Sequence, residues 1–148
     1  MRLQGKVALI TGGASGMGKV ASGLFAGEGA DVVLSDLSDE AGETTVAEIS
    51  RLGGDAAYVH ADVSKATDAE GMVRFAVERF GRLDILYNNA GVMLADDGSV
   101  TDTAEDVWDR TLAINVKGVA LGCKYGVPAM LDFGGGACPP GRRAPRRR

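Results

Sequence analysis

The sequence predicts an α/β fold, in which a parallel β-sheet carries helices on both of its faces. Two patterns support this prediction. A glycine-rich run, residues 11–18, follows directly after the apolar stretch Val7–Ile10, and short apolar segments then alternate with longer helical ones. Such alternation is typical of βαβ units, whose strands pair in parallel. The length of 148 residues suits a single domain, and 45% hydrophobic with 24% charged residues is ordinary for a soluble α/β protein.

Four strands and four helices are expected in strict alternation. The strands are short apolar runs of the kind that a buried sheet requires, and the helices are segments in which apolar residues recur at helical spacing. In chain order the expected elements are strand Val7–Ile10, helix Met17–Glu28, strand Asp31–Leu34, helix Glu40–Leu52, strand Ala56–His60, helix Ala66–Phe80, strand Leu83–Tyr87 and a long helix Ala104–Leu131.

The glycine-rich run has the features of a phosphate-binding turn. A strand must turn sharply into a helix there, so that the first free N–H groups of the helix face a diphosphate, and glycine tolerates both the turn and the close approach. The residues of this run that are predicted to bind the cofactor are Thr11, Gly12, Ser15, Gly16, Met17 and Gly18. The alternative is a glycine-rich turn without a ligand, which the surrounding strand and helix pattern disfavours.

An acidic residue follows the second strand at the distance that a dinucleotide-binding unit requires. Asp36 lies 20 positions after Gly16, where a Rossmann unit places the carboxylate that accepts hydrogen bonds from the adenosine ribose. Asp36 and the adjacent Leu37 are therefore predicted to bind the cofactor, with a plain surface carboxylate as the alternative for Asp36. Because a carboxylate suits a free 2′-hydroxyl and repels a 2′-phosphate, we expect NAD rather than NADP. The expected fold class is thus a Rossmann-like, doubly wound parallel sheet.

Several motifs together resemble the short-chain dehydrogenase/reductase family. They are Thr-Gly-x-x-x-Gly-x-Gly at residues 11–18, Asp62-Val63 after the third strand, Asn88-Asn89-Ala90-Gly91 after the fourth, and Asn115 within the last helix. The resemblance runs from about Leu3 to Gly136 and implies an incomplete sheet of about four strands in the order 3-2-1-4. Family members that prefer NADP often carry an arginine where this chain has Ser15, so the resemblance also favours NAD.

The resemblance implies further site residues. The positions that match the family's adenine-binding and cleft-lining segments are Asp62, Val63, Asn89, Ala90 and Gly91. Asn115 matches the asparagine that holds a water in the family's proton relay, so it is the catalytic residue that the resemblance implies. The alternatives are a helix-capping role for Asp62 and a plain turn at residues 89–91.

The family's catalytic serine, and its tyrosine with a lysine four residues on, have no counterpart after Asn115. The last serine is Ser99, the last lysine is Lys124, and no Tyr-x-x-x-Lys pattern occurs in the sequence. A tyrosine without such a lysine has a pKa near ~10 and is a poor base at neutral pH. We therefore expect the NAD-binding half of an oxidoreductase for secondary alcohols or ketones, with little or no turnover of its own. A non-catalytic NAD-binding module is the alternative function.

The composition changes near Ala137. Residues 1–136 are expected to form the dinucleotide-binding domain. Residues 137–148 hold three of the four prolines and five of the 16 basic residues, all arginines, and are expected to be a disordered tail. One hypothesis is that this tail is the product of a frameshift. Another is that it binds a polyanion, but we do not expect nucleic acid as a partner, because the rest of the chain is acidic and the tail lacks aromatic residues.

Partners and location are also expected from the sequence. The substrate that the resemblance implies is a small alcohol or ketone. With no fifth strand predicted, Leu83–Tyr87 would be an exposed apolar edge, and self-association is expected through it or through the helix 104–131. Cys123 and Cys138 match no metal motif and His60 has no expected partner, so no metal site is predicted. No apolar run reaches the ~18 residues of a membrane span and no signal peptide is evident, which gives an expected cytoplasmic location.

Overall fold

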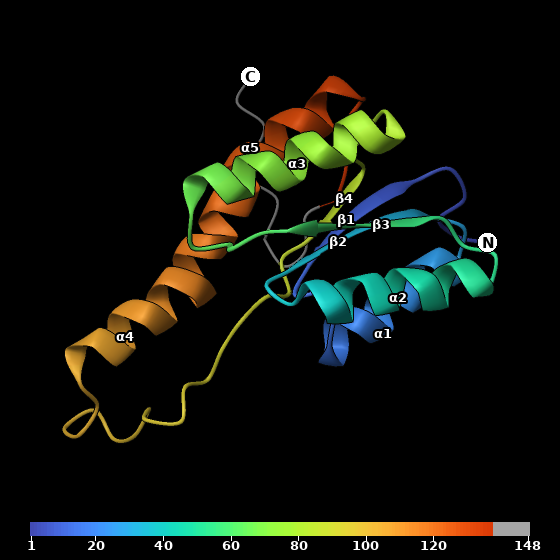
Figure 1. Ribbon diagram of the computed structural model, residues 1–148. Helices are drawn as coiled ribbons and strands as arrows, with labels where there is room; N and C mark the ends of the chain where they lie inside the picture. The colour runs from blue at the N-terminus through green and yellow to red at the C-terminus, as the bar shows by residue number, and fades with distance from the viewer. Residues whose placement is uncertain (138–148) are drawn as a thin grey trace.

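The computed structural model describes residues 1–137, and its centre is a four-stranded parallel sheet in the order β3-β2-β1-β4 (Figure 1). The predicted fold class and strand order are confirmed. The strands are β1 (Val7–Thr11), β2 (Asp31–Asp36), β3 (Ala56–His60) and β4 (Ile85–Tyr87). The helices are α1 (Gly16–Gly27), α2 (Asp39–Arg51), α3 (Ala66–Phe80), α4 (Glu105–Leu112), the π-helical turn η1 (Ala113–Gly118) and α5 (Val119–Asp132).

The sheet is buried on both faces because helices cover each side. Helices α1 and α2 lie on one face, and α3 and α5 lie on the other (Figure 1). Neighbouring residues of β1 point to opposite faces, so Leu9 packs with Met72 and Leu86 on the side of α3 and α5. On the other side, Ile10 packs with Leu34. This two-sided burial explains why the strands are continuous apolar runs. Within residues 1–137, no helix combines the length and the apolar character needed to cross a membrane.

The predicted helix 104–131 is helical from Glu105 onward but is not one regular α-helix, and Ala104 is its extended N-cap residue. Its middle, Ala113–Gly118, is a π-helical turn that separates α4 from α5. In a π-helical turn each hydrogen bond closes one residue further along the chain than in an α-helix, and such turns occur frequently at functional sites. Asn115 lies within this turn.

Glycines spaced four residues apart bring this helical segment close to the ends of the strands. They are Gly118, Gly122 and Gly126, and all three are buried. A Cβ added at Gly122 would overlap the side-chain oxygen of Asn88, and one added at Gly118 would lie 2.9 Å from Cγ2 of Val63. The helix can therefore rest directly on the residues that follow β3 and β4.

The expectation of a bare edge at β4 is wrong at the first residue of this strand, Ile85. Ala137 forms a parallel bridge with Ile85, in which the N–H of Ala137 donates to the carbonyl of Asp84 (2.8 Å) and the N–H of Leu86 donates to the carbonyl of Ala137 (3.0 Å). Ala137 is the first residue of the predicted tail, and its main chain is instead hydrogen-bonded to the sheet. A single bridged residue has no hydrophobic period, so the sequence pattern could not reveal it. The rest of the predicted tail, residues 138–148, lies outside the described residues.

Candidate functional site

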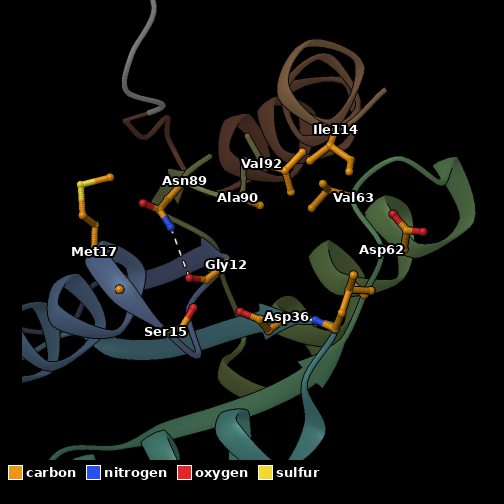
Figure 2. A pocket seen from close by; sticks show the side chains of 14 residues that line it. Gly12, Ser15, Met17, Asp36, Asp62, Val63, Asn89, Ala90, Val92 and Ile114 are labelled. Atoms are coloured by element: carbon orange, nitrogen blue, oxygen red, sulfur yellow. Dashed lines mark hydrogen bonds between the residues drawn. The ribbon is translucent and has the colours of Figure 1, made fainter. Parts of the chain in front are cut away.

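A pocket of about 330 Å³ lies at the carboxyl ends of the strands, where the strand order reverses on either side of β1. Ligands of open α/β sheets bind at such a position. Figure 2 shows residues from the segments that follow all four strands around this pocket. The described residues that line it are Gly12, Ser15, Gly16, Met17, Asp36, Leu37, Ala61, Asp62, Val63, Asn89, Ala90, Gly91, Val92 and Ile114. Every residue predicted to bind the cofactor is among them except Thr11 and Gly18.

Thr11 lies behind the pocket and joins the ends of β1 and β4. Its hydroxyl oxygen accepts hydrogen bonds from the N–H groups of Asn89 and Ala90, each at 3.0 Å. In return the side-chain amide of Asn89 donates to the carbonyls of Thr11 (3.0 Å) and Gly12 (3.2 Å), the second of which is drawn in Figure 2. Thr11 is 2% exposed, so its hydroxyl binds other groups of the protein and is not accessible to a ligand. It fixes the glycine-rich loop against the segment after β4.

Gly12 and Gly18 are two of the loop positions where another residue would not fit. Gly12 has a φ of +65°, which lies in the left-handed region. A Cβ added at Gly18 would overlap the carbonyl oxygen of Gly12 and lie 2.6 Å from the side-chain nitrogen of Asn89. Gly18 therefore lets α1 begin close to the end of β1. The structure places it beneath the loop and not on the pocket wall.

The N-terminus of α1 faces the pocket without a neutralising group. Ser15 is the N-cap residue, and within the described part of the chain it makes no side-chain capping hydrogen bond. Helices α2, α3 and α4 each carry at least one acidic residue in the first turn, whereas α1 carries none there. The positive end of the α1 dipole is thus left for another partner. An anionic group such as a diphosphate fits this end of the pocket.

The carboxylate of Asp36 is held in place by three main-chain N–H groups. One oxygen accepts from Ala14 in the glycine-rich loop (3.1 Å), and the other accepts from Leu37 (2.8 Å) and Ser38 (3.3 Å). Two carboxylate oxygens offer about four acceptor sites, so the group can still accept a hydrogen bond from a ligand hydroxyl. Asp36 and Leu37 both line the pocket. The arrangement fits the ribose-binding role predicted for Asp36.

Asp62 lines the pocket while its carboxylate is engaged in a local turn. One oxygen accepts hydrogen bonds from the hydroxyl (2.7 Å) and the N–H (3.0 Å) of Ser64, and the other lies 3.4 Å from Nζ of Lys65. The hydrogen bond from the Ser64 hydroxyl is the largest of the effects that hold the pKa of Asp62 below its usual value. The N-cap residue of α3 is Lys65, so Asp62 precedes the helix as a turn residue and does not cap it. Its contact with an adenine ring stays a prediction.

Asn115, the predicted catalytic residue, holds the pocket wall and is not itself among the described lining residues. Its side-chain oxygen accepts the N–H of Val92 and its side-chain nitrogen donates to the carbonyl of Val92, both at 2.8 Å. Val92 and Ile114 do line the pocket, and Figure 2 shows their side chains together with that of Val63 at one wall. The structure thus places Asn115 behind Val92, in contact with a lining residue. Its role toward a water molecule stays a prediction.

Three lining residues were missed by the sequence analysis. Ala61, Val92 and Ile114 are apolar and belong to no motif. Each, however, stands next to a predicted site residue in the sequence: Ala61 before Asp62, Val92 after Gly91, and Ile114 before Asn115. These residues could have been found as sequence neighbours of the motifs. When one residue lines a pocket, the residues next to it in the chain lie close to the same pocket.

Comparison with known proteins identifies the family. A family model described as short chain dehydrogenase matches residues 6–138. The chain belongs to the short-chain dehydrogenase family. A Thermotoga maritima protein described as an uncharacterized oxidoreductase is 50% identical to this chain over 136 residues, covering 92% of this chain and 53% of the relative. Tropinone reductase-like 1 of Erythroxylum coca is 43% identical over 133 residues, covering 88% of this chain and 48% of the relative.

Solved structures give the same result. The crystal structure of a hydroxysteroid dehydrogenase from Escherichia coli matches this chain with a TM-score of 0.86 at 34% identity, covering 93% of this chain and 57% of that one. A short-chain dehydrogenase/reductase variant from Serratia marcescens matches with a TM-score of 0.84 at 37% identity, covering 88% and 53%. The chain spans about half the length of the curated relatives that it matches.

Proposed function

We propose that this chain binds NAD(H) in the pocket at the carboxyl ends of its strands, as the dinucleotide-binding half of an oxidoreductase for secondary alcohols or ketones. One observation carries the proposal: the uncompensated N-terminus of α1 and the carboxylate of Asp36 line the same pocket. The first suits an anionic diphosphate and the second suits ribose hydroxyls. Membership of the short-chain dehydrogenase family supports the class of reaction.

Each part of the pocket has a role in this proposal. The main-chain N–H groups at Gly16 and Met17 would hold the diphosphate, Asp36 would accept the hydroxyls of the adenosine ribose, and Asp62 with Val63 would border the adenine. When bound, NAD would take up a hydride and NADH would release one. Because the negative charge of Asp36 would repel a 2′-phosphate, the proposed cofactor is NAD and not NADP.

We further infer that these 148 residues bind the dinucleotide without oxidising an alcohol. Removing a hydride from an alcohol carbon also requires removal of the hydroxyl proton, and the sequence has no serine after Ser99 and no Tyr-x-x-x-Lys pattern. Tyr58 does not supply a substitute base. Burial, together with the hydrogen bond to Asp39, raises the pKa of its hydroxyl, so Tyr58 keeps its proton.

The partners expected from the sequence belong to the same proposal. They are an alcohol or ketone substrate, expected for full-length members of the family, and a second copy of this chain. Five large apolar residues are exposed on the helical segment 104–131, and this exposure supports self-association through that segment. They are Trp108, Leu112, Val116, Val127 and Leu131.

Calorimetric titration with NADH and NADPH tests the proposal, with Asp36→Asn as the variant and Asp132→Asn as the control. Asp132 is an exposed residue at the end of α5 and is not among the described residues that line the pocket. The wild-type chain should bind NADH more tightly than NADPH. Asp36→Asn should lose about 10- to 100-fold in NADH affinity, as expected when a hydrogen bond to a charged group is removed, and Asp132→Asn should match the wild type.

Two results would contradict the proposal. Equal NADH affinity in the wild type and in Asp36→Asn would show that the ribose hydroxyls do not hydrogen-bond to this carboxylate. Formation of NADH from NAD and any of a panel of secondary alcohols, measured by absorbance with the wild-type chain, would overturn the inference of binding without turnover.

A further inference from the structure

Three polar side chains form a cluster beside the turn that carries Asp36. The hydroxyl of Tyr58 lies 2.7 Å from Oδ1 of Asp39 and 2.9 Å from the main-chain oxygen of Asp36. Nδ1 of His60 lies 2.7 Å from the same oxygen of Asp39. The expectation that His60 has no partner is therefore wrong. The partner stands 21 positions away in the sequence, so only the folded chain brings the two together.

The cluster ties both ends of one short turn to the neighbouring strand. Asp36 is the last residue of β2 and Asp39 is the first residue of α2, whereas Tyr58 and His60 lie on β3. In the parallel register Asp36 stands opposite His60. The hydroxyl of Tyr58, whose register partner is Leu34, thus contacts the last residue of β2 and also the first residue of α2.

The ring of Tyr58 is itself held by packing. It lies against Gly42 of α2, where an added Cβ would overlap the ring carbons. Burial, together with the hydrogen bond to Asp39, raises the pKa of the Tyr58 hydroxyl, so this group remains a donor. The hydrogen bonds from Tyr58 and His60 lower the pKa of Asp39, so its carboxylate remains an acceptor. Tyr58 therefore stays the donor and Asp39 the acceptor of their hydrogen bond at neutral pH.

The turn fixed by this cluster also sets the direction of the Asp36 carboxylate. That carboxylate accepts the N–H groups of Leu37 and Ser38, which are the two residues inside the turn. If the turn moved, these donors would move with it. The hydroxyl of Tyr58 therefore acts on the Asp36 carboxylate through the main chain. Tyr58 is not among the described residues that line the pocket.

We propose that Tyr58, held by Asp39 and His60, is a positioning residue for the ribose-binding carboxylate of Asp36. The inference rests on the proposed binding of NAD(H) and extends it to residues outside the pocket. It predicts that removing one hydroxyl group from β3 weakens the binding of the dinucleotide, and that it does so through Asp36.

A double-mutant cycle with NADH titration tests this inference. Tyr58→Phe deletes the hydroxyl and keeps the ring, and it should weaken NADH binding about fivefold, because the hydroxyl acts on the ribose-binding carboxylate only through the main chain. In the Asp36→Asn background the same change should have little effect, because the two residues act as one unit. Tyr125→Phe on α5, whose ring lies beside Lys124, is the matched control and should leave the affinity unchanged.

The possible outcomes separate this inference from the proposed function. A wild-type chain that does not bind NADH overturns both. A wild-type chain that binds NADH, with Tyr58→Phe either equal to it or equally harmful in both backgrounds, overturns only the positioning role. Should Tyr58→Phe fail to fold, Asp39→Ala carries the same cycle. Asp39 is 70% exposed at its side chain, and its loss should weaken NADH binding in the wild-type background alone.

Discussion

Asn115 holds both main-chain polar groups of Val92. Its side-chain oxygen accepts the N–H of Val92 and its side-chain nitrogen donates to the carbonyl, each at 2.8 Å. Only a primary amide offers an acceptor and a donor side by side in this way. Because Val92 lines the pocket and Asn115 lies in the π-helical turn, this pair attaches one wall of the pocket to the helical segment.

Replacing Asn115 by leucine, a side chain of similar size, should release this wall. The N–H of Val92 loses its acceptor, so its hydrogen exchange with solvent should become faster, and the free energy of unfolding should fall by about 1 kcal/mol. Exchange of the Val92 amide followed by NMR measures the effect. Lys117→Ala, on the same helical turn and exposed, is the control. If the Val92 amide exchanged equally slowly in Asn115→Leu and wild type, the pair would have no role in holding the wall.

Asp84 should make the stability of the fold depend on pH. It is 3% exposed and accepts hydrogen bonds from Arg82 at two atoms (2.6 and 2.7 Å), from Lys6 (3.3 Å) and from the N–H of Val7 (3.0 Å). Burial alone would raise the pKa of Asp84, but these donors outweigh it and hold the pKa below its usual value. The folded state therefore binds the Asp84 proton less tightly than the unfolded chain does. This contribution to stability is present above the unfolded pKa of about 3.9 and is lost as the pH falls through the lower, folded pKa.

Urea unfolding of the wild type and of Asp84→Asn between about pH 3 and pH 7 checks the sign. The wild type should be the more stable protein at neutral pH, and the difference in unfolding free energy should shrink as the pH falls below about 4. A difference that stays constant over the whole range would mean that the charge of Asp84 does not stabilise the fold.

The close contact at Gly122 should make alanine harmful there although alanine favours helices. The added Cβ would overlap the side-chain oxygen of Asn88, so Gly122→Ala should lower the free energy of unfolding by about 1–3 kcal/mol. Gly71 lies within α3, and an added Cβ would meet no atom of the described residues within 4 Å. Gly71→Ala should therefore raise stability by about 0.5–1 kcal/mol. Thermal unfolding of each variant, compared with the wild type, measures both changes in stability. Changes of the same sign would contradict the close-contact argument.

The parts of the fold that follow from local requirements could be predicted from the sequence. Gly12 and Asp36 stand where a phosphate-binding turn and a ribose carboxylate must stand in a βαβ unit, and both line the pocket. The strands were recognised because burial on both faces demands continuous apolar runs. The strand order came from the resemblance to the family, since periodicity alone does not say which strands are neighbours.

The parts that depend on distant contacts could not be predicted. The π-helical turn around Asn115 has the same apolar pattern as an α-helix. The bridge between Ala137 and Ile85 involves one residue, and the contact of Tyr58 with Asp39 depends on the register between β3 and the end of β2. Each is set by tertiary packing, which overrides local preference.

The carboxylate of Asp36 has a consequence for the thermodynamics of ligand capture. Its hydrogen bond to Ala14 joins the loop after β1 to the loop after β2, so both loops are already ordered before any ligand arrives. A ligand that contacts both would lose little chain entropy on association, because the protein has met that cost during folding. Without this link each loop would keep only its other contacts, and a ligand that bridges the two loops would have to fix their relative position on binding.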